Sequence, residues 1–408
     1  MADRGQGKIT RMSRLAQAFT PRAPVVQRDL FAGRHRQLAR CLMALGQPGL
    51  HVAVYGERGV GKTSLANVLP AWITELNRPD VRAVRINCDV EDNFSSIWTK
   101  AFRELRDPWR EADGSIDPEA IRFRLESDER AYLIVLDELD RIKDSSALTL
   151  LADTVKTMSD HRVSTHLMLV GVAQSIEHLI GEHESVVRCL EQVEMPRMTS
   201  KELEQILVHG YGSVNMTIED SANSSIIEMA EGLPHFAHLL GLSSGTLAIE
   251  DDRDIVVRSD VDRAIRKETE THTLMSTYRM ATHSTQPKHL YEQVLVACAM
   301  APKDELGYFR MSDVVRPLSA VLHRDASIQL LAPHLSEFTS QERGRVLHRE
   351  GKPHRPRFRF RDPLLQPFAK LAALADGRVD QAVLDRFPAR VPSEAGEDVW
   401  EGPNGRVE

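Results

Sequence analysis

Residues 50–64 read LHVAVYGERGVGKTS, with three glycines, one lysine, one threonine and one serine in close succession. The spacing GxxxxGK[ST] lets a loop turn its backbone N–H groups inward around phosphate oxygens, at the positive end of a following helix. Lys62 can then reach the β- and γ-phosphates of a nucleotide, and the Thr63 hydroxyl can ligate Mg²⁺. We therefore expect ATP and Mg²⁺ to bind this loop, through Gly56, Glu57, Arg58, Gly59, Val60, Gly61, Lys62, Thr63 and Ser64.

A second site element lies about 75 residues further on, in the stretch AYLIVLDELDR. The run Leu133–Leu136 is apolar throughout, as in a parallel strand buried on both faces, and it ends in two acids. Asp137 is expected to hold Mg²⁺, and Glu138 to orient and deprotonate the attacking water. Together with Lys62, these residues predict ATP hydrolysis.

The elements around these motifs predict an α/β fold. Short apolar runs such as HVAVYG, VRAVRINCD, YLIVLDE, HLMLVG and LEQVEMP alternate with helical stretches over residues 29–197. This alternation indicates a parallel sheet covered by helices, with its ligand at the carboxyl ends of the strands.

At this point the chain resembles the AAA+ ATPases, in the branch that contains origin-recognition ATPases, transposition ATPases and the STAND signalling ATPases. The stretch DLFAGRHRQLARCL looks like the FxGR box of that branch, with Phe31, Gly33 and Arg34 at the matching positions. In relatives this box lines the adenine pocket. The resemblance covers residues 29–272 by specific motifs, and residues 285–365 by pattern alone.

The resemblance implies further site residues. HLMLVGVAQS resembles the sensor 1 strand and places Gln174 or Ser175 near the γ-phosphate. ESVVRCLEQVEMPRMTSKEL resembles the segment with the arginine finger, and Arg188 is the matching candidate beside the alternative of an ordinary surface arginine. EGLPHFAHLLG resembles the GxP motif of the lid, with Pro234 near the nucleotide. The sensor 2 position there holds His235, where many AAA+ proteins have arginine, and we expect it to be a packed helix residue.

The domain organisation follows from composition and periodicity. Residues 1–28 form a basic arm, for which a flexible segment without function is the preferred interpretation and a docking arm the alternative. The nucleotide-binding α/β domain spans 29–197 and a helical lid, in which the strands stop, spans 198–272. Residues 285–372 contain three helical stretches and then a hairpin, the order of a winged helix. The acidic tail, 376–408, is expected to be disordered.

The most basic stretch of the chain lies in the expected hairpin. Eight lysines and arginines and a single acid, Glu350, lie between Arg343 and Arg361, although the whole chain carries a formal charge of −7. Alternation buries Phe358 and Phe360 and turns Arg357, Arg359 and Arg361 outward. The expected contacts to a double-stranded DNA backbone are Arg345, Arg349, Lys352, Arg355, Arg357 and Arg359.

The third helical stretch, SIQLLAPHLSEFTS, contains no lysine or arginine, so base-specific reading is not expected. These features predict an ATP-dependent switch that engages DNA non-specifically and forms homo-oligomers when ATP is bound. A signalling or defence ATPase with a regulatory winged helix and a protein partner is the alternative, and a nucleotide-binding scaffold with little turnover is a third possibility. The four cysteines are far apart, and no apolar run reaches 18 residues, which fits a cytoplasmic protein without a membrane span.

Overall fold

The computed structural model describes residues 2–75, 81–110, 114–128, 130–172, 184–284, 290–304, 307–351 and 355–387. These residues form two compact units. The first, which we call the sheet unit, is Pro24–Pro196. The second, which we call the helical unit, joins the N-terminal residues up to Ala23 with the residues from Arg197 onward. The chain therefore crosses between the units twice, at 23–24 and at 196–197.

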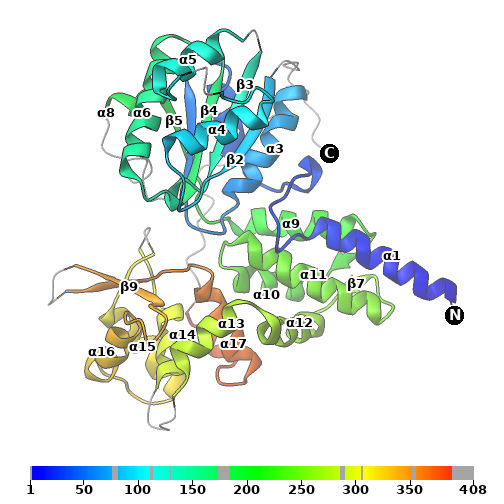
Figure 1. Ribbon diagram of the computed structural model, residues 1–408. Coiled ribbons are helices and arrows are strands. Elements are labelled where there is room, and N and C mark those ends of the chain that lie inside the picture. The colour runs from blue at the N-terminus through cyan, green and yellow to red at the C-terminus, as the bar shows by residue number, and fades with distance from the viewer. Residues whose placement is uncertain are drawn as a thin grey trace. The chain divides into compact units, whose positions relative to one another are not determined.

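The sheet unit contains a five-stranded parallel sheet in the order β2-β3-β4-β1-β5. This confirms the predicted α/β class (Figure 1). Its strands are β1 (His51–Gly56), β2 (Val81–Asn87), β3 (Ala131–Asp137), β4 (His166–Val172) and β5 (Leu190–Glu194). Because β1 and β3 are near neighbours, with β4 between them, the residues that follow these strands come to the same edge of the sheet.

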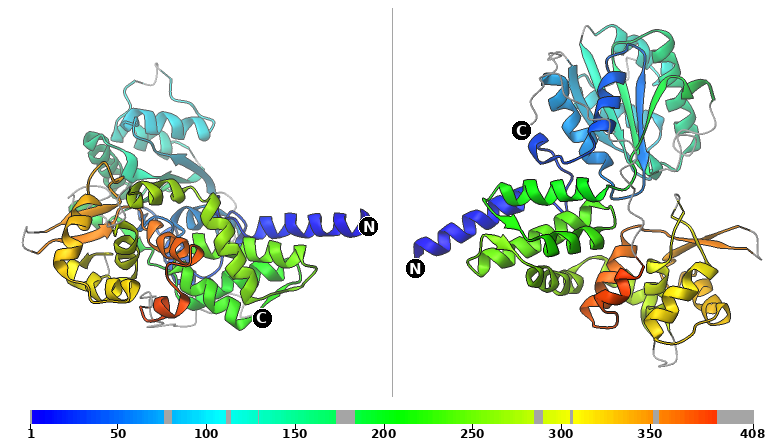
Figure 2. Two further views of the ribbon diagram at one scale, coloured as in Figure 1. Left: turned by 90° about the horizontal axis from the view of Figure 1, so that it is seen from below. Right: turned by 180° about the vertical axis from the view of Figure 1, so that it is seen from behind.

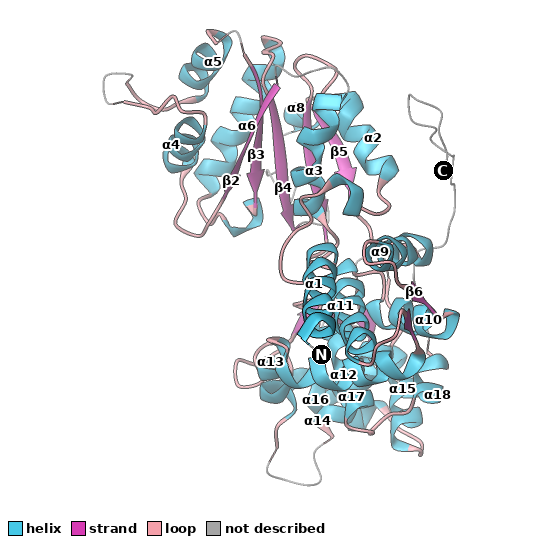
Figure 3. Ribbon diagram, turned by 90° about the vertical axis from the view of Figure 1, so that its right-hand side faces the viewer, coloured by secondary structure: helices cyan, strands magenta, loops and turns pink. Residues whose placement is uncertain are grey.

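Helices cover both faces of the sheet (Figure 3), which explains why β3 and β4 are almost continuously apolar. Ile134, Leu136 and Leu169 belong to one core cluster with side chains of α4, α5 and α6, while the alternate strand residues are buried on the other face. The helices of the unit are α2 (His35–Ala44), α3 (Lys62–Glu75), α4 (Phe94–Glu104), α5 (Pro118–Glu126), α6 (Ser145–Asp160) and α8 (Glu184–Val187).

The first part of the helical unit corresponds to the predicted lid. Its helices are α9 (Ser200–Gly212), α10 (Asp220–Ala230), α11 (Pro234–Glu250) and α12 (Arg258–Thr271). A capping box between Thr199 and Glu202 begins α9, as the sequence TSKE indicates. The prediction that the strands stop here was wrong in detail, because Thr217–Ile218 (β6) and Ile255–Val256 (β7) form a short parallel pair. Two-residue strands are too short to leave a periodic pattern.

The N-terminal residues are a helix, α1 (Ala2–Ala18), and the preferred prediction of a flexible arm was wrong. Leu15 and Phe19 are fully buried against α9 and α11, beside which α1 lies in Figures 1 and 2. Three glycines make the space: a Cβ on Gly210 or Gly241 would lie 2.3 or 2.5 Å from the Phe19 ring, and one on Gly245 would lie 2.8 Å from Leu15. The arm is docked because these glycines leave room for Leu15 and Phe19 beside Tyr211 and His238.

The second part of the helical unit holds α13 (Leu274–Thr282), α14 (Tyr291–Met300), α15 (Met311–Leu322) and α16 (Ile328–Glu337). An antiparallel sheet in the order β8-β10-β9 accompanies them, with β8 (Phe309–Arg310), β9 (Leu347–Glu350) and β10 (Arg357–Phe360). The predicted hairpin is β9–β10, and β8 is a third strand that the sequence did not suggest. Phe309, Phe358 and Phe360 pack together on its buried face.

The chain then forms α17 (Leu365–Ala375) and α18 (Gln381–Asp385). Disorder was predicted from residue 376 onward, but α18 is capped by Asp380 and buries Val383 and Leu384. The rest of the predicted tail, 388–408, lies outside the described residues. Among the helices that the structure describes, none has the length and apolar character needed to cross a membrane.

Candidate nucleotide site and basic face

The loop Gly56–Thr63, which we call the phosphate loop, joins the end of β1 to the start of α3. Gly56, Gly59 and Gly61 have φ angles of 150°, 86° and 98°, a region that side chains with a Cβ rarely adopt. Gly56 is also sterically required, since a Cβ there would lie 2.4 Å from the Met195 carbonyl oxygen. The loop conformation therefore depends on these glycines.

Lys62 turns back over the loop. Its ammonium group donates hydrogen bonds to the carbonyl oxygens of Gly56 at 3.0 Å and Glu57 at 2.7 Å. Burial lowers the pKa of Lys62 to about 8, against the opposing charges of Asp140, Asp137 and Glu57. The buried cation is thus paired only incompletely, and a polyphosphate is the kind of ligand that would neutralise it.

The two predicted Mg²⁺ ligands are neighbours. Burial raises the pKa of Asp137, while hydrogen bonds from the Thr63 side chain and from the Glu138 backbone N–H, at 2.9 Å, act in the opposite direction. A hydroxyl beside a buried carboxylate fits Mg²⁺, which prefers a few oxygen ligands together with substrate phosphates. The part of the chain that the structure describes contains no cluster of three or more His, Cys, Asp or Glu that could hold a metal ion.

Glu138 follows Asp137 at a left-handed backbone position, with φ 60°. Its side chain is half exposed and forms an ion pair with Arg141 at 2.9 Å. The carboxylate is therefore accessible to water next to the phosphate loop, which fits the predicted role.

Asp140 is a site residue that the sequence interpretation missed. Its charge is the largest of the interactions that hold up the pKa of Lys62, and its Oδ1 accepts a hydrogen bond from the Val172 N–H at 2.7 Å. It thus links the acidic stretch to the end of β4, two residues before Gln174, the residue predicted at sensor 1. In the sequence, Asp140 could have been found as the third acid of the stretch DELD, which begins at Asp137.

Arg34 of the FxGR box is buried, with 2% of its surface exposed, and it too has a left-handed backbone. Its guanidinium donates to the carbonyl oxygens of Val60, at 3.2 Å, and Pro196, at 2.5 Å. Arg34 therefore connects the phosphate loop to the last residue of the sheet unit.

The other residues predicted to contact the nucleotide are Arg188, Gln174, Ser175 and Pro234. Arg188 is exposed between α8 and β5, and its role as a finger stays a prediction. Gln174 and Ser175 lie outside the described residues. Pro234 and His235 begin α11 in the helical unit, where the His235 ring bonds the Pro21 carbonyl oxygen at 2.8 Å and His272 at 3.3 Å.

The outer face of the β8-β10-β9 sheet, opposite the buried phenylalanines, is called the basic face here. It shows the predicted alternation. Phe358 and Phe360 are buried, while Arg357 and Arg359 are half buried on the other side, each over the Tyr308 ring. Arg357 forms ion pairs with Glu350 at 3.3 Å and Asp304 at 3.5 Å.

Three other arginines of the predicted set, Arg345, Arg349 and Arg355, are exposed, and Lys352 lies outside the described residues. Among the described residues, Arg359 forms no ion pair. The neighbouring Arg343 is different, because it stacks on Tyr291 and donates to the Ala281 carbonyl oxygen.

The fold and the site geometry are those of an AAA+ ATPase: a phosphate loop with its lysine and threonine follows β1, and an aspartate–glutamate pair lies at the end of β3, which β4 separates from β1 in the parallel sheet. In agreement, residues 46–180 match the protein-family model described as the AAA domain.

Within this class the chain is similar to the ORC1-type DNA replication protein 8 of Halobacterium salinarum, with 25% identity over 312 residues, which cover 66% of this chain and 76% of the relative. Its fold is similar to that of the ORC1 protein of Aeropyrum pernix, solved in complex with DNA, at 17% identity with a TM-score of 0.50 over 91% of this chain and 97% of that one. The Aeropyrum pernix ORC2 protein, solved as ADPNP–ADP complexes, matches with a TM-score of 0.50 at 14% identity, over 91% and 98%.

Proposed function

We propose that the protein is an ATP-dependent switch that binds double-stranded DNA non-specifically through its basic face. The observation that carries the DNA part is the alternation along β10, which fixes Phe358 and Phe360 in the core and presents Arg357 and Arg359 outward. Arginines held in this way on a rigid strand suit a regular array of phosphates. The DNA replication relative and the DNA-bound neighbour support the same partner.

The nucleotide part of the proposal assigns one role to each residue of the site. The N–H groups of the phosphate loop and Lys62 bind the phosphates, and Thr63 and Asp137 would hold Mg²⁺, which supplies charge neutralisation on the transferred phosphate. Glu138 orients the attacking water and accepts its proton. Arg188 is the proposed finger in a neighbouring copy, so turnover is expected to rise with protein concentration.

Hydrolysis is tested by phosphate release from the wild-type protein, Glu138→Gln and Lys62→Ala. Glu138→Gln is expected to bind ATP with near-normal affinity but to lose at least 100-fold in turnover, because it removes the base. Lys62→Ala should lose binding as well. Turnover of Glu138→Gln equal to that of the wild type would reject the assignment of the base.

DNA binding is tested by the anisotropy of a labelled duplex of unrelated sequence across a salt series. Arg359→Ala is expected to weaken binding to all sequences alike and to reduce the salt slope by about 1. Arg130→Ala, which removes a surface arginine of the sheet unit, is the matched control and should change neither quantity.

The ion pair between Arg357 and Glu350 allows a second variant that should change DNA binding in the opposite direction. Glu350→Gln removes the acid that competes with phosphate for Arg357, so it should tighten DNA binding several-fold. If neither Arg359→Ala nor Glu350→Gln changes DNA retention, the basic face is not the DNA contact. The protein-partner switch, with the arginines used for docking, would then be the better interpretation.

A further inference from the structure

The segment Met195–Met198, which contains the second crossing between the units, is attached to a functional motif at each end. On the sheet-unit side, the Met195 N–H donates to the Tyr55 carbonyl oxygen at 2.8 Å, and Arg34 joins the Pro196 and Val60 carbonyl oxygens. The phosphate loop is therefore hydrogen-bonded to this segment through Arg34.

On the helical-unit side, the same segment holds the turn before α11. The Met198 N–H donates to the Gly232 carbonyl oxygen at 2.8 Å, and Arg197 donates to the Glu231 carbonyl oxygen at 3.2 Å. The fit is close, because a Cβ on Gly232 would lie 2.7 Å from the Cβ of Arg197. The position of Arg197 therefore fixes the position of Glu231.

Glu231 is the centre of a buried ion cluster. Its side chain is 0% exposed and contacts Lys370, Arg197 at 3.6 Å and the Gln366 amide at 2.5 Å. Burial alone would raise the pKa of Glu231, but Lys370, Lys303 and Arg197 outweigh it and keep the carboxyl charged. A buried charge can be moved only together with its partners, since separating them leaves a charge without compensation.

The cluster reaches the second part of the helical unit through α17 and α14. Gln366 and Lys370 are one helical turn apart on α17, and Lys303 donates to the carbonyl oxygens of Cys298, Ala299 and Ala301 at the end of α14. Burial lowers the pKa of Lys303 to about 7, against the opposing charge of Glu231.

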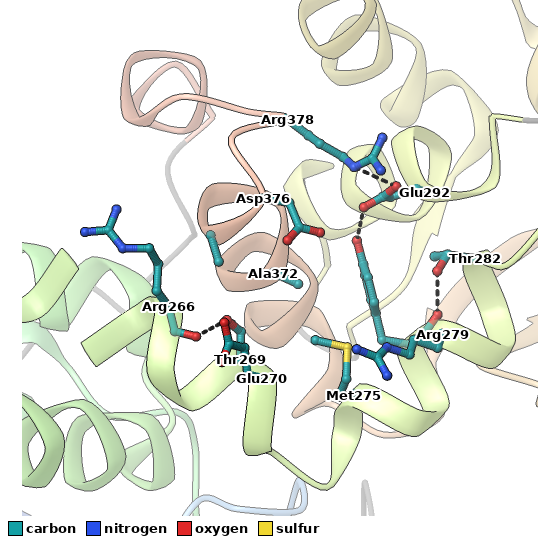
Figure 4. Close-up of a pocket in the computed structure, with 12 residues that line it drawn as sticks. Arg266, Thr269, Glu270, Met275, Arg279, Thr282, Glu292, Ala372, Asp376 and Arg378 are labelled. Carbon is teal, nitrogen blue, oxygen red and sulfur yellow. Dashed lines mark hydrogen bonds and ion pairs between the residues drawn. The ribbon is translucent and has the colours of Figure 1, made fainter. Parts of the chain in front are cut away.

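A pocket borders the far side of α17. Ala372, Ala375 and Asp376, on the other side of the helix from Gln366 and Lys370, line a cavity of about 630 Å³ between α12, α13, α14 and α17. Figure 4 shows Ala372 and Asp376 at this cavity, with Arg378 and Glu292 joined across it at 2.9 Å. Helix α17 is thus held by the ion cluster on one side and borders this pocket on the other.

We propose that Glu231 is the residue that couples the phosphate loop to the region carrying the basic face. A change at the loop moves Met195–Met198, this segment moves Glu231, and the ion cluster carries α17 with it. The inference rests on the proposed switch function but not on DNA binding, and Glu231 acts as a positioning residue that does not touch the nucleotide.

The test follows hydrogen exchange of the α17 amides in the full chain, without nucleotide and with AMPPNP and Mg²⁺. In the wild type the nucleotide is expected to change exchange in Leu365–Ala375 at least threefold. Glu231→Gln, which keeps the shape and the hydrogen bond to Gln366, should bind AMPPNP within about threefold of wild-type affinity and lose the response of α17.

Asp260→Asn is the matched control. Asp260 is also fully buried in the helical unit and is paired with Arg253 at 2.5 and 2.7 Å, but none of its described polar partners lies in Met195–Met198 or α17, so its variant should keep the response. Lys370→Met, which leaves Arg197 to balance Glu231, gives a second test if Glu231→Gln folds poorly. The inference would be overturned if the nucleotide changed hydrogen exchange of α17 in both Glu231→Gln and Lys370→Met, or did not change it in the wild type. Loss of DNA retention with an intact α17 response would instead reject only the DNA part of the proposed function.

Discussion

The carboxylate of Glu138 lies 2.9 Å from the guanidinium of Arg141, three residues along the chain, so the proposed base is already hydrogen-bonded before any water is activated. Both side chains are half exposed, and an exposed pair of this kind is worth less than about 1 kcal/mol. The interaction can therefore be broken during the catalytic cycle, but it competes with the attacking water for the carboxylate.

Removing this competitor should speed turnover. We expect Arg141→Ala to raise the steady-state rate of phosphate release by up to about fivefold, the factor that corresponds to about 1 kcal/mol. Lys143→Ala is the control, because it removes a nearby exposed cation that pairs with no residue in the described ranges. A fall in the rate of Arg141→Ala would mean that Arg141 takes part in catalysis.

The pH dependence of ATP binding should show the titration of Lys62. The charged amine pairs with phosphate, and its pKa in the nucleotide-free protein is about 8, so affinity should be nearly constant below pH 7 and fall up to about tenfold per pH unit above 8. Equilibrium titration with a fluorescent ATP analogue measures this. Lys62→Ala should bind more weakly and show no such decline; an equal decline in Lys62→Ala would assign it to another group.

The same pKa predicts the sign of a stability effect. Burial lowers the pKa of Lys62 from 10.5 in the unfolded chain to about 8, so the unfolded state binds more protons between these values. The contribution of Lys62 to the free energy of unfolding should therefore increase as pH rises from 8 to 10.5. In denaturant titrations of the nucleotide-free proteins, the free energy of unfolding of the wild type minus that of Lys62→Ala should rise over this range, and a constant difference would contradict the shift.

Arg34 should not be replaceable by lysine. Arg34 donates to the carbonyl oxygens of both Val60 and Pro196 through Nη2, at the far end of a side chain longer than that of lysine, so a lysine ammonium does not reach this position, and one lost charge-assisted hydrogen bond costs about 2 kcal/mol. Arg34→Lys is thus expected to bind ATP at least tenfold more weakly in the analogue titration. Arg36→Lys, at an exposed position of α2, should bind as the wild type does. Equal affinities for the two variants would show that Arg34 does not support the loop.

The groove that receives Phe19 should not accept a methyl group. In Gly241→Ala the added carbon would lie 2.5 Å from the Phe19 ring, and overpacking of this kind costs about 1–3 kcal/mol. Urea denaturation should show this loss, and Phe19→Leu in the same chain should recover part of it. Gly212→Ala is the control, because nothing lies within 4 Å of its added carbon. A neutral Gly241→Ala would mean that Phe19 is not held in the groove.

The phosphate loop and the acid pair could be predicted because their chemistry depends on consecutive residues. Gly56, Gly59 and Gly61 have to be glycine for local backbone reasons, and Asp137 follows a strand whose apolar run is complete in itself. The order of the strands then brings both to one edge of the sheet, as expected for this class.

The predictions that failed depend on partners far away in the chain. Nothing in the sequence around Leu15 and Phe19 indicates that glycines some 200 residues later form their groove. The role proposed for Glu231 likewise depends on its contacts with Arg197 and Lys370. In the same way, the two residues of β8 are a strand only because β10 pairs with them. Local periodicity contains no information on such contacts.

The docked N-terminal helix has a consequence for synthesis of the chain. Leu15 and Phe19 leave the ribosome first, but Gly210, Gly241 and Gly245 follow only after the whole sheet unit has been made. In sequence, the sheet unit is inserted into the helical unit. It can therefore fold before α1 has its partners, while Leu15 and Phe19 are still exposed. We therefore expect nascent chains that end before residue 245 to be the ones that need a chaperone at their N-terminus.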